Sequence, residues 1–205
     1  MLELWHTKQN PAWLILARME NKYKFGKEVE YSELTIIKPE DKNKLQAFCC
    51  GNDILDHYIH EEIFEDKDAQ GLHFIVTDKK TGDVICFVSL TTSGIIFREG
   101  SYTEVLPSIK IDVFAVDVQY QKMHFDEESF QSDEHFYLSD DIMCAVIRHC
   151  REIDENYAMV NYILLYADKK AERFYERNGY GHFCEFMEQE HKMEINENIP
   201  MYLEL

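Results

Sequence analysis

Two histidines and a glutamate have the residue types and the spacing of metal ligands. His57 and His60 lie three residues apart in a stretch with helical periodicity, and Glu61 follows directly. Residues three apart share one face of a helix, so both imidazoles could bind one ion. Helical histidines at this spacing are commonly incidental, and no C-x-x-C pair supplies thiolate ligands. We therefore predict that the chain holds no metal.

Other charged residues could act on an amine or on a phosphate. Asp112 alternates with Ile111 and Val113 in an extended pattern, so its carboxylate could face a cleft and accept a proton. The alternative is a structural or solvent-exposed acid. Lys169 and Arg173, at the start of a predicted helix, could contact phosphate groups or could simply be solvated.

The overall charge restricts the classes of partner. The chain of 205 residues has 39 acidic and 21 basic side chains, for a net charge of −18 with histidine neutral. Such a field repels polyanions and attracts cations, so we expect no nucleic-acid or anionic-membrane partner. The cations that it attracts include amines, which bears on encounter and not on the fold.

The cysteines and the apolar segments predict a cytoplasmic protein. The six cysteines mostly lie in apolar strings, where a reduced thiol behaves as a small hydrophobic group. Residues 1–5 lack the basic start of a signal peptide, and no apolar run approaches the roughly 18 residues of a membrane helix.

The elements that must position these residues follow from periodicity and from capping signals. Strands are predicted over residues 33–37, 72–77, 83–90, 109–118, 160–166 and 201–205. Helices are predicted to begin at Pro39, at Asn52 or Asp53, at Ser139 and at Asp168, the last ending at Gly179. Residues 91–107 are expected to form a looser connection. This order predicts an α/β (α+β) domain, with a mixed sheet and helices on both faces.

Two further segments stand apart from this pattern. Residues 1–28 form a partly apolar N-terminal extension, with helical turns expected over residues 13–19. Residues 125–138 form an acidic segment without clear periodicity, which we interpret as an insertion.

Four segments, taken in order, resemble one branch of the GNAT N-acetyltransferase superfamily. Residues 48–58 are similar to its F-x-C-G-N-x-x-L-D-x-F/Y opening, and residues 83–90 to its G-x-V-V-G-Y-Y-T-L strand. Residues 114–121 resemble its L-A-V-D-x-x-Y-Q strand end, and residues 171–180 its A-x-x-F-Y-x-x-x-G-F helix. The branch includes toxins that acetylate aminoacyl-tRNA and many uncharacterised bacterial acetyltransferases.

The resemblance implies a GNAT fold over residues 29–205, with a mixed sheet of six to seven strands. It implies a bacterial enzyme that transfers an acetyl group from acetyl-CoA, as cosubstrate, to an amine by direct attack in a ternary complex. The acceptor would be a small amine, a peptide N-terminus or a lysine, and a homodimer is an option. The implied general acid is Tyr175, with Asp112 as a candidate base. The implied cofactor-binding residues are Phe114, Ala115, Val116, Gln121, Lys122, Met123, His124, Lys169 and Arg173.

The chain departs from the family where the CoA diphosphate should bind. The family's Q/R-x-x-G-x-G/A loop is here Q-K-M-H-F-D, without glycine, and seven acids but no Lys or Arg lie between His124 and Asp141, Asp141 included. One carboxylate about 6 Å from a phosphate charge costs about 3 kcal/mol at an effective dielectric near 20. Two hypotheses follow: an active acetyltransferase that holds CoA differently, or a catalytically silent GNAT-fold protein-interaction module that has lost CoA binding.

Overall fold

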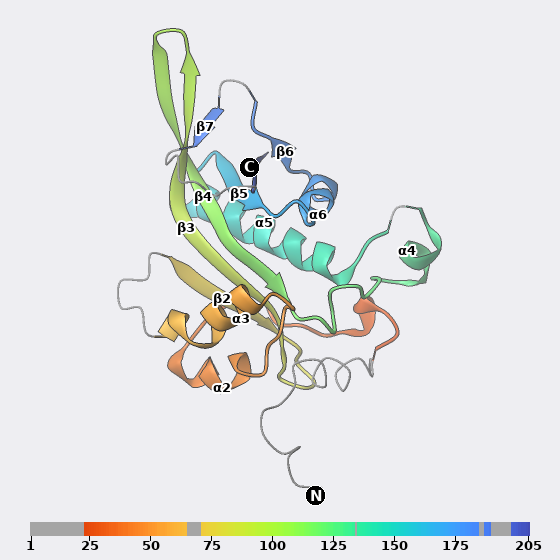
Figure 1. Cartoon of the computed structure of the whole chain (residues 1–205). Helices are drawn as coiled ribbons and strands as arrows, with labels where there is room; N and C mark the ends of the chain where they lie inside the picture. Colours follow the sequence, from red (N-terminus) through yellow and green to blue (C-terminus); the bar gives the residue numbers. More distant parts are fainter. Residues whose placement is uncertain (1–22, 65–70, 134, 185–186, 190–197) are drawn as a thin grey trace, which may run out of the picture.

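A mixed sheet with helices on both faces forms the protein (Figure 1). The computed structural model describes residues 23–64, 71–133, 135–184, 187–189 and 198–205. Within these residues the sheet has eight strands in the order β1-β2-β3-β4-β5-β8-β6, and β7 pairs with β3. The strands are β1 (Thr35–Ile36), β2 (Leu72–Thr77), β3 (Val84–Glu99), β4 (Tyr102–Val116), β5 (Tyr162–Ala167), β6 (Gly181–His182), β7 (Met187–Gln189) and β8 (Ile199–Glu204).

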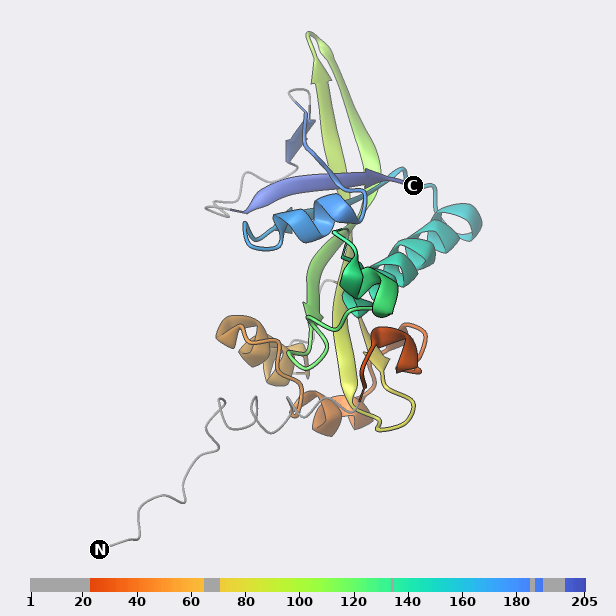
Figure 2. The same cartoon turned by 90° about the vertical axis from the view of Figure 1, so that its right-hand side faces the viewer.

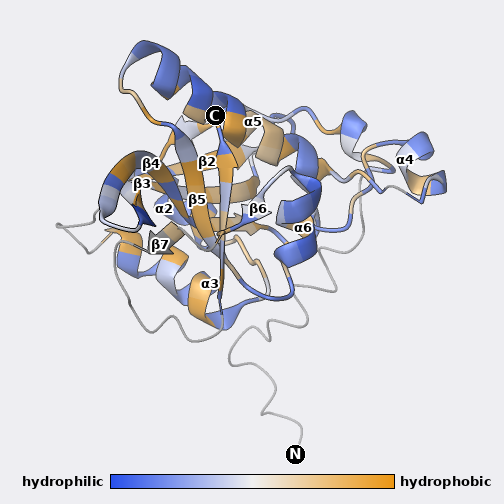
Figure 3. Ribbon diagram, turned by 90° about the horizontal axis from the view of Figure 1, so that it is seen from above, coloured by the Kyte–Doolittle hydropathy of each residue, from blue (hydrophilic) through white to orange (hydrophobic). Residues whose placement is uncertain are grey.

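The helices lie in two layers. They are η1 (Gly26–Glu28), η2 (Pro39–Asp41), α2 (Lys42–Leu45), α3 (Asp53–His60), η3 (Glu62–Phe64), α4 (Glu127–Gln131), α5 (Leu138–Asn156) and α6 (Glu172–Arg177). Viewed from above, α3 and α5 lie on opposite sides of largely apolar strands (Figure 3). No helix in the described part of the chain is long and apolar enough to span a membrane.

Each face of the sheet has its own apolar core. On the α5 side, Ile142, Val146 and Cys150 are fully buried, as expected for the apolar face of an amphipathic helix. On the other side, α2 and α3 cover the sheet through Leu45, Phe48 and Ile59, among others. The alternation of strand residues between two cores explains why β3 is an almost continuous apolar run.

The prediction of a loose connection over residues 91–107 was wrong. β3 and β4 stay paired from Cys86–Val116 out to Glu99–Tyr102, so they form a long hairpin that projects beyond the sheet (Figure 2). Gly100, with φ of +62°, turns the chain at its tip. Ser93 and Gly94 interrupt the apolar alternation, although β7 pairs beside them and Ile95 is fully buried.

Two predicted helix starts were also displaced. α5 begins at Leu138 with Tyr137 as its N-cap, and Ser139 is a buried residue of the first turn. Asp168 caps a turn by accepting from the Lys170 N–H (2.8 Å), and α6 begins only at Glu172. In both places a carboxylate accepts from a backbone N–H, Asp140 from Tyr137 and Asp168 from Lys170. However, α5 begins before the predicted residue and α6 begins after it. The Asn52 cap of α3 and the left-handed Gly179 (φ +89°) are confirmed.

The end of the predicted extension contacts the predicted insertion. The N–H groups of Gly26 and Lys27 donate to the carbonyls of His124 and Phe125, each at 2.8 Å. Residues 23–28 therefore pack with the domain, whereas residues 13–19, where helical turns were expected, lie outside the described residues. The insertion contains the short helix α4, which lies away from the sheet (Figure 1).

Candidate active site

The sheet opens between β4 and β5, the only parallel strand pair among the described residues. β4 and β5 are paired from Ser108–Tyr162 to Ile111–Leu165, and beyond this point β4 continues to Val116 along β3. The last residues of β4 therefore present one strand edge that no described strand covers. Backbone groups on such an edge can hydrogen-bond to an extended ligand.

A β-bulge marks the point at which the two strands separate. The pairing of β3 with β4 shifts between Ser89 and Leu90, whose partners are Val113 and Ile111, so Asp112 is the extra residue. A bulge bends its strand and redirects a side chain, and bulges are frequent next to active sites.

Tyr175 is held on the α5 side of this opening. Its ring packs between Phe174 and Tyr180, with centroid distances of 5.1 and 5.6 Å, and 8% of the residue is exposed. Burial, with a smaller electrostatic contribution from the Cys86 thiol, raises the pKa of Tyr175 well above the ordinary value of tyrosine. Its hydroxyl makes no hydrogen bond to any described residue. The phenol is therefore protonated at neutral pH and is free to donate.

Aromatic rings fill the space beside the free edge of β4. Phe114 stacks on Phe174 of α6 with centroids 5.5 Å apart and planes at 22°. The side chains of Ala115 and Val116 are buried, on opposite faces of the sheet. These three residues thus have core side chains, as expected, and any role toward a ligand falls to their backbone.

Residues 121–125 stand where the family has its diphosphate loop, and backbone N–H groups of this segment donate to carbonyls of the protein itself. The N–H groups of Gln121, Met123 and Phe125 donate to the carbonyls of Asp117 (3.2 Å), Tyr120 (3.2 Å) and Phe136 (2.9 Å). The N–H of Leu138, in the first turn of α5, donates to Met123 (2.9 Å). Amides engaged in this way are not available to a phosphate.

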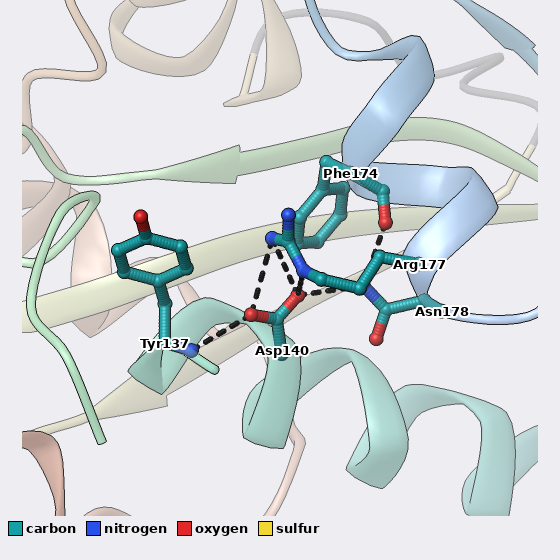
Figure 4. Close-up of polar contacts among 5 residues, drawn as sticks. All are labelled: Tyr137, Asp140, Phe174, Arg177 and Asn178. Carbon is teal, nitrogen blue, oxygen red and sulfur yellow. Dashed lines mark hydrogen bonds and ion pairs between the residues drawn. The ribbon is translucent and has the colours of Figure 1, made fainter. Parts of the chain in front are cut away.

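A carboxylate of the chain itself occupies the N-terminus of α5 (Figure 4). Asp140 is 1% exposed and accepts from the Tyr137 N–H (2.8 Å). It also forms an ion pair with Arg177 through Nε (3.0 Å) and Nη2 (2.8 and 3.1 Å), and accepts from Asn178 Nδ2 (2.8 Å). The negative charge that a helix N-terminus favours is thus already in place. We call Asp140, Arg177 and Asn178 the Asp140 clamp.

The Arg177 side chain connects this clamp to the aromatic stack. Its guanidinium lies 5.3 Å from the ring centroid of Tyr137 and 5.6 Å from that of Phe174. Arg177 was missed in the sequence analysis, although it lies two residues after Tyr175 in the same motif. Arginine so close to two aromatic residues and an acid cluster was the available signal.

The other predicted cofactor residues are placed differently. Gln121 donates through Nε2 to the carbonyls of Cys50 (2.7 Å) and Val116 (2.8 Å), so its side chain anchors the end of β4. Met123 is buried, and the His124 ring packs on Tyr137 with centroids 4.6 Å apart. The side chains of Lys122, Lys169 and Arg173 are exposed.

Part of the family-like sequence has a structural role. Asp117, which is 1% exposed, accepts from the Cys49 N–H (3.0 Å), and Asp56 accepts from the Cys50 N–H (2.7 Å). Asp117 thus joins the turn before α3 to the end of β4, and Asp56 joins the same turn to α3. The resemblance of residues 48–58 and 114–121 therefore reports on the fold more directly than on the chemistry.

The predicted base, Asp112, has its charge satisfied. It forms an ion pair with Lys110 Nζ (2.7 Å) and accepts from Thr91 Oγ1 (2.7 Å). His73, which was not predicted, lies nearby, and the Asp112 charge acts on its imidazole.

The predicted metal spacing is not used in the structure. His60 Nε2 bonds to the Phe48 carbonyl (2.8 Å), while His57 is 3.8 Å from Glu62. A different group lies at the edge of the sheet, where His182 Nε2 is 3.4 Å from Glu172 and 3.2 Å from Glu176. These three exposed or half-exposed side chains could hold a divalent cation or a shared proton equally well.

Comparison with known proteins identifies the fold. No protein-family model and no curated protein matches the sequence. Among solved structures, a bacterial toxin superposes with a TM-score of 0.60 and 18% identity, over 86% of this chain and 91% of its own. The AtaTR complex with acetyl-CoA gives 0.58 and 15%, over 85% and 94%, and the KacTA–DNA complex gives 0.57 and 17%, over 85% and 93%. The chain has the GNAT fold.

The expected absence of a nucleic-acid partner conflicts in part with these neighbours. KacTA was solved with DNA, and AtaT with acetyl-methionyl-tRNA and with an antitoxin segment. At this level of identity the likeness establishes the GNAT fold alone.

Proposed function

We propose that the protein is an acetyl-CoA-dependent N-acetyltransferase that acts on a primary amine. The observation that carries the proposal is the opening between β4 and β5, where no described strand covers the end of β4. On the α5 side lies Tyr175, whose hydroxyl bonds to no described residue. Structural neighbours with the same fold were solved with acetyl-CoA, which supports this choice of donor.

The chemistry requires a held thioester and a donor for the leaving thiolate. In the proposed complex, the pantetheine arm pairs with the backbone of Phe114–Val116, and an N–H near the bulge polarises the thioester carbonyl. The amine attacks the carbonyl carbon, the C–S bond breaks, and Tyr175 gives its proton to the sulfur. Its raised pKa keeps the phenol protonated at neutral pH, so the proton is present when the thiolate forms.

The CoA diphosphate must be held in an altered way. The Asp140 clamp and the loop hydrogen bonds occupy the amides that the GNAT fold otherwise offers. We place the phosphates near the exposed cations Lys122, Lys169 and Arg173, where each contact contributes less than a buried one. The donor is therefore expected to bind weakly for this fold, and the Phe114–Phe174 stack must shift to admit the pantetheine arm.

The acceptor is proposed to be a small amine, a peptide N-terminus or a lysine. The charge of −18 attracts cations and repels the tRNA backbone. An aminoacyl-tRNA acceptor is the competing class, since AtaT was solved with acetyl-methionyl-tRNA.

Thiol release from acetyl-CoA in the presence of a panel of amines and peptides tests the proposal. Acceptor-dependent release, with a mass increase of one acetyl group on the amine, is expected. A complete lack of turnover with every amine, peptide and aminoacyl-tRNA tested would favour the silent interaction module, whose supporting observation is the occupied α5 N-terminus.

A further inference from the structure

The imidazole of His73 has one nitrogen with no partner. Its Nδ1 lies 3.1 Å from the Ser89 hydroxyl, whereas Nε2 is covered from solvent and bonds to no other described residue. Leaving a buried polar atom without a partner is unfavourable, so such atoms are rare and call for an explanation. When Nδ1 carries the proton and donates to Ser89, Nε2 presents a lone pair.

The fold places this nitrogen on the sheet face opposite α5, beside the bulge. His73 on β2 pairs with Ser89 on β3, and Ser89 pairs with Val113 on β4, next to the extra residue Asp112. Two strand spacings separate the His73 and Val113 backbones, which is about 10 Å. An amine lying over β3 would therefore have His73 on one side and the end of β4 on the other.

The groups around the imidazole favour its neutral form and fix its orientation. From α3, Tyr58 meets the ring edge to face, with centroids 6.3 Å apart, and from β3, Phe87 stacks on it at 5.7 Å. Burial lowers the pKa of His73 below the ordinary histidine value, while Asp112 on β4 acts in the opposite direction. The ion pair with Lys110 largely neutralises the Asp112 charge. The result is an imidazole that is unprotonated at neutral pH.

We propose that His73 is the general base for the acceptor amine, and that the polar face around Ser89, Thr91 and Asp112 is the acceptor site. This inference rests on the proposed acetyltransferase function. Because Nε2 is covered in the structure, the side chains over it must move when the acceptor binds. The amine then loses one proton to Nε2, directly or through one water, as its nitrogen forms the bond to the acetyl carbon. The C–S bond breaks and the sulfur takes the Tyr175 proton. The imidazolium releases its proton to solvent and the phenolate takes one from solvent, so that amide and CoA thiol are the only products of the free amine.

The test compares two acceptors of similar size that differ in their need for a base. Each acceptor reacts as its free base and loses one N–H proton as the amide forms, and the additional proton of methylammonium leaves to solvent beforehand. The methylamine nitrogen is much more basic, so water removes its N–H proton poorly and a protein base is needed, whereas the adduct of hydroxylamine gives this proton to water readily. Thiol release from acetyl-CoA is measured with each acceptor for the wild type, His73→Gln and the matched control His57→Gln, which alters an exposed histidine on α3. Calorimetry with acetyl-CoA accompanies each variant and reports donor binding separately.

The expected result is a split between the acceptors. His73→Gln lowers kcat/KM for methylamine by about 10²–10⁴-fold, while hydroxylamine turnover and acetyl-CoA binding change little. Equal losses for both acceptors with intact donor binding would show that His73 is structural and would overturn the inference. Failure of the wild type to bind acetyl-CoA would instead overturn the proposed function, and this inference with it.

Discussion

At the scale of single residues, two buried side chains have different roles: Tyr175 is assigned to catalysis and Asp140 to stability. The Tyr175 hydroxyl bonds to no described residue, so its polar atom contributes little to the described fold and is available for chemistry. Asp140 has every oxygen engaged, so it stabilises the junction of α5 and α6. Substitutions at the two positions should therefore separate catalysis from stability.

Replacing Tyr175 with phenylalanine should remove activity and leave the fold intact. The variant loses the acid that protonates the thiolate, so kcat should fall by about 10²–10⁴-fold. The free energy of unfolding should change by less than about 0.5 kcal/mol, because no hydrogen bond to a described residue is lost. Steady-state kinetics and urea unfolding measure both quantities. Tyr180→Phe, at a buried tyrosine whose hydroxyl contacts only Met143 Sδ (3.6 Å) among the described residues, is the control and should keep its activity.

Replacing Asp140 with asparagine should destabilise the protein. The Arg177 ion pair and the charge-assisted bonds from Tyr137 and Asn178 weaken together. Because 36% of the Arg177 side chain is exposed and water can solvate it, the loss should be about 2 kcal/mol, below that of a fully buried pair. Urea unfolding measures the change, with the exposed Asp133→Asn as control. Equal stability of the two variants would show that the clamp is unimportant.

At the scale of elements, the acidic insertion is closed at its base by strand-like contacts. Phe125 donates to the Phe136 carbonyl, and His124 bridges to Tyr137. The segment between them can therefore be shortened without moving α5. Its helix α4 is capped by its own residues, Asp126 and Ser129, and packs on His124 through Phe130.

Joining Phe125 to Phe136 through Gly-Gly should leave a folded protein that still binds acetyl-CoA. Two glycines suit a tight hairpin turn, and the loss of the His124 packing should cost about 1–2 kcal/mol. Removal of five acids should, if anything, favour an anionic donor. Calorimetry and thermal unfolding test both points. Loss of function with retained folding would indicate that the insertion is itself an interaction surface.

The sequence predicted most elements, but it did not predict that backbone amides within residues 121–125 and the N-terminus of α5 already have partners within the protein. Helical periodicity located α3 and α5, and Gly179 marked the end of α6, because these signals are local. The hairpin of β3 and β4 was missed because glycine and serine break its alternation, while its pairing depends on the partner strand. The Asp140 clamp joins residues 37 positions apart, and His73 is a base candidate only through contacts with β3 and β4. Contacts between elements of this kind have no local signature.

At the scale of the whole molecule, net charge is the feature that bears on nucleic-acid binding. The net charge of −18 makes approach to a phosphate backbone unfavourable at long range. The GNAT fold shared with AtaT and KacT is therefore compatible with a different acceptor.

Bulk tRNA should not bind the protein at physiological salt. Fluorescence anisotropy with labelled tRNA should show no saturable signal, at either low or physiological ionic strength. Binding that weakens steeply as salt is added would indicate cationic contacts to phosphates and would restore the aminoacyl-tRNA class of acceptor.

The central claim is that the opening between β4 and β5 still receives acetyl-CoA although the α5 N-terminus is occupied. Calorimetric titration of the full chain with acetyl-CoA tests it most directly. Saturable binding of one donor per chain is predicted, weaker than nanomolar because exposed lysines and an arginine replace the loop amides. Absence of any heat of binding at millimolar acetyl-CoA would contradict the account.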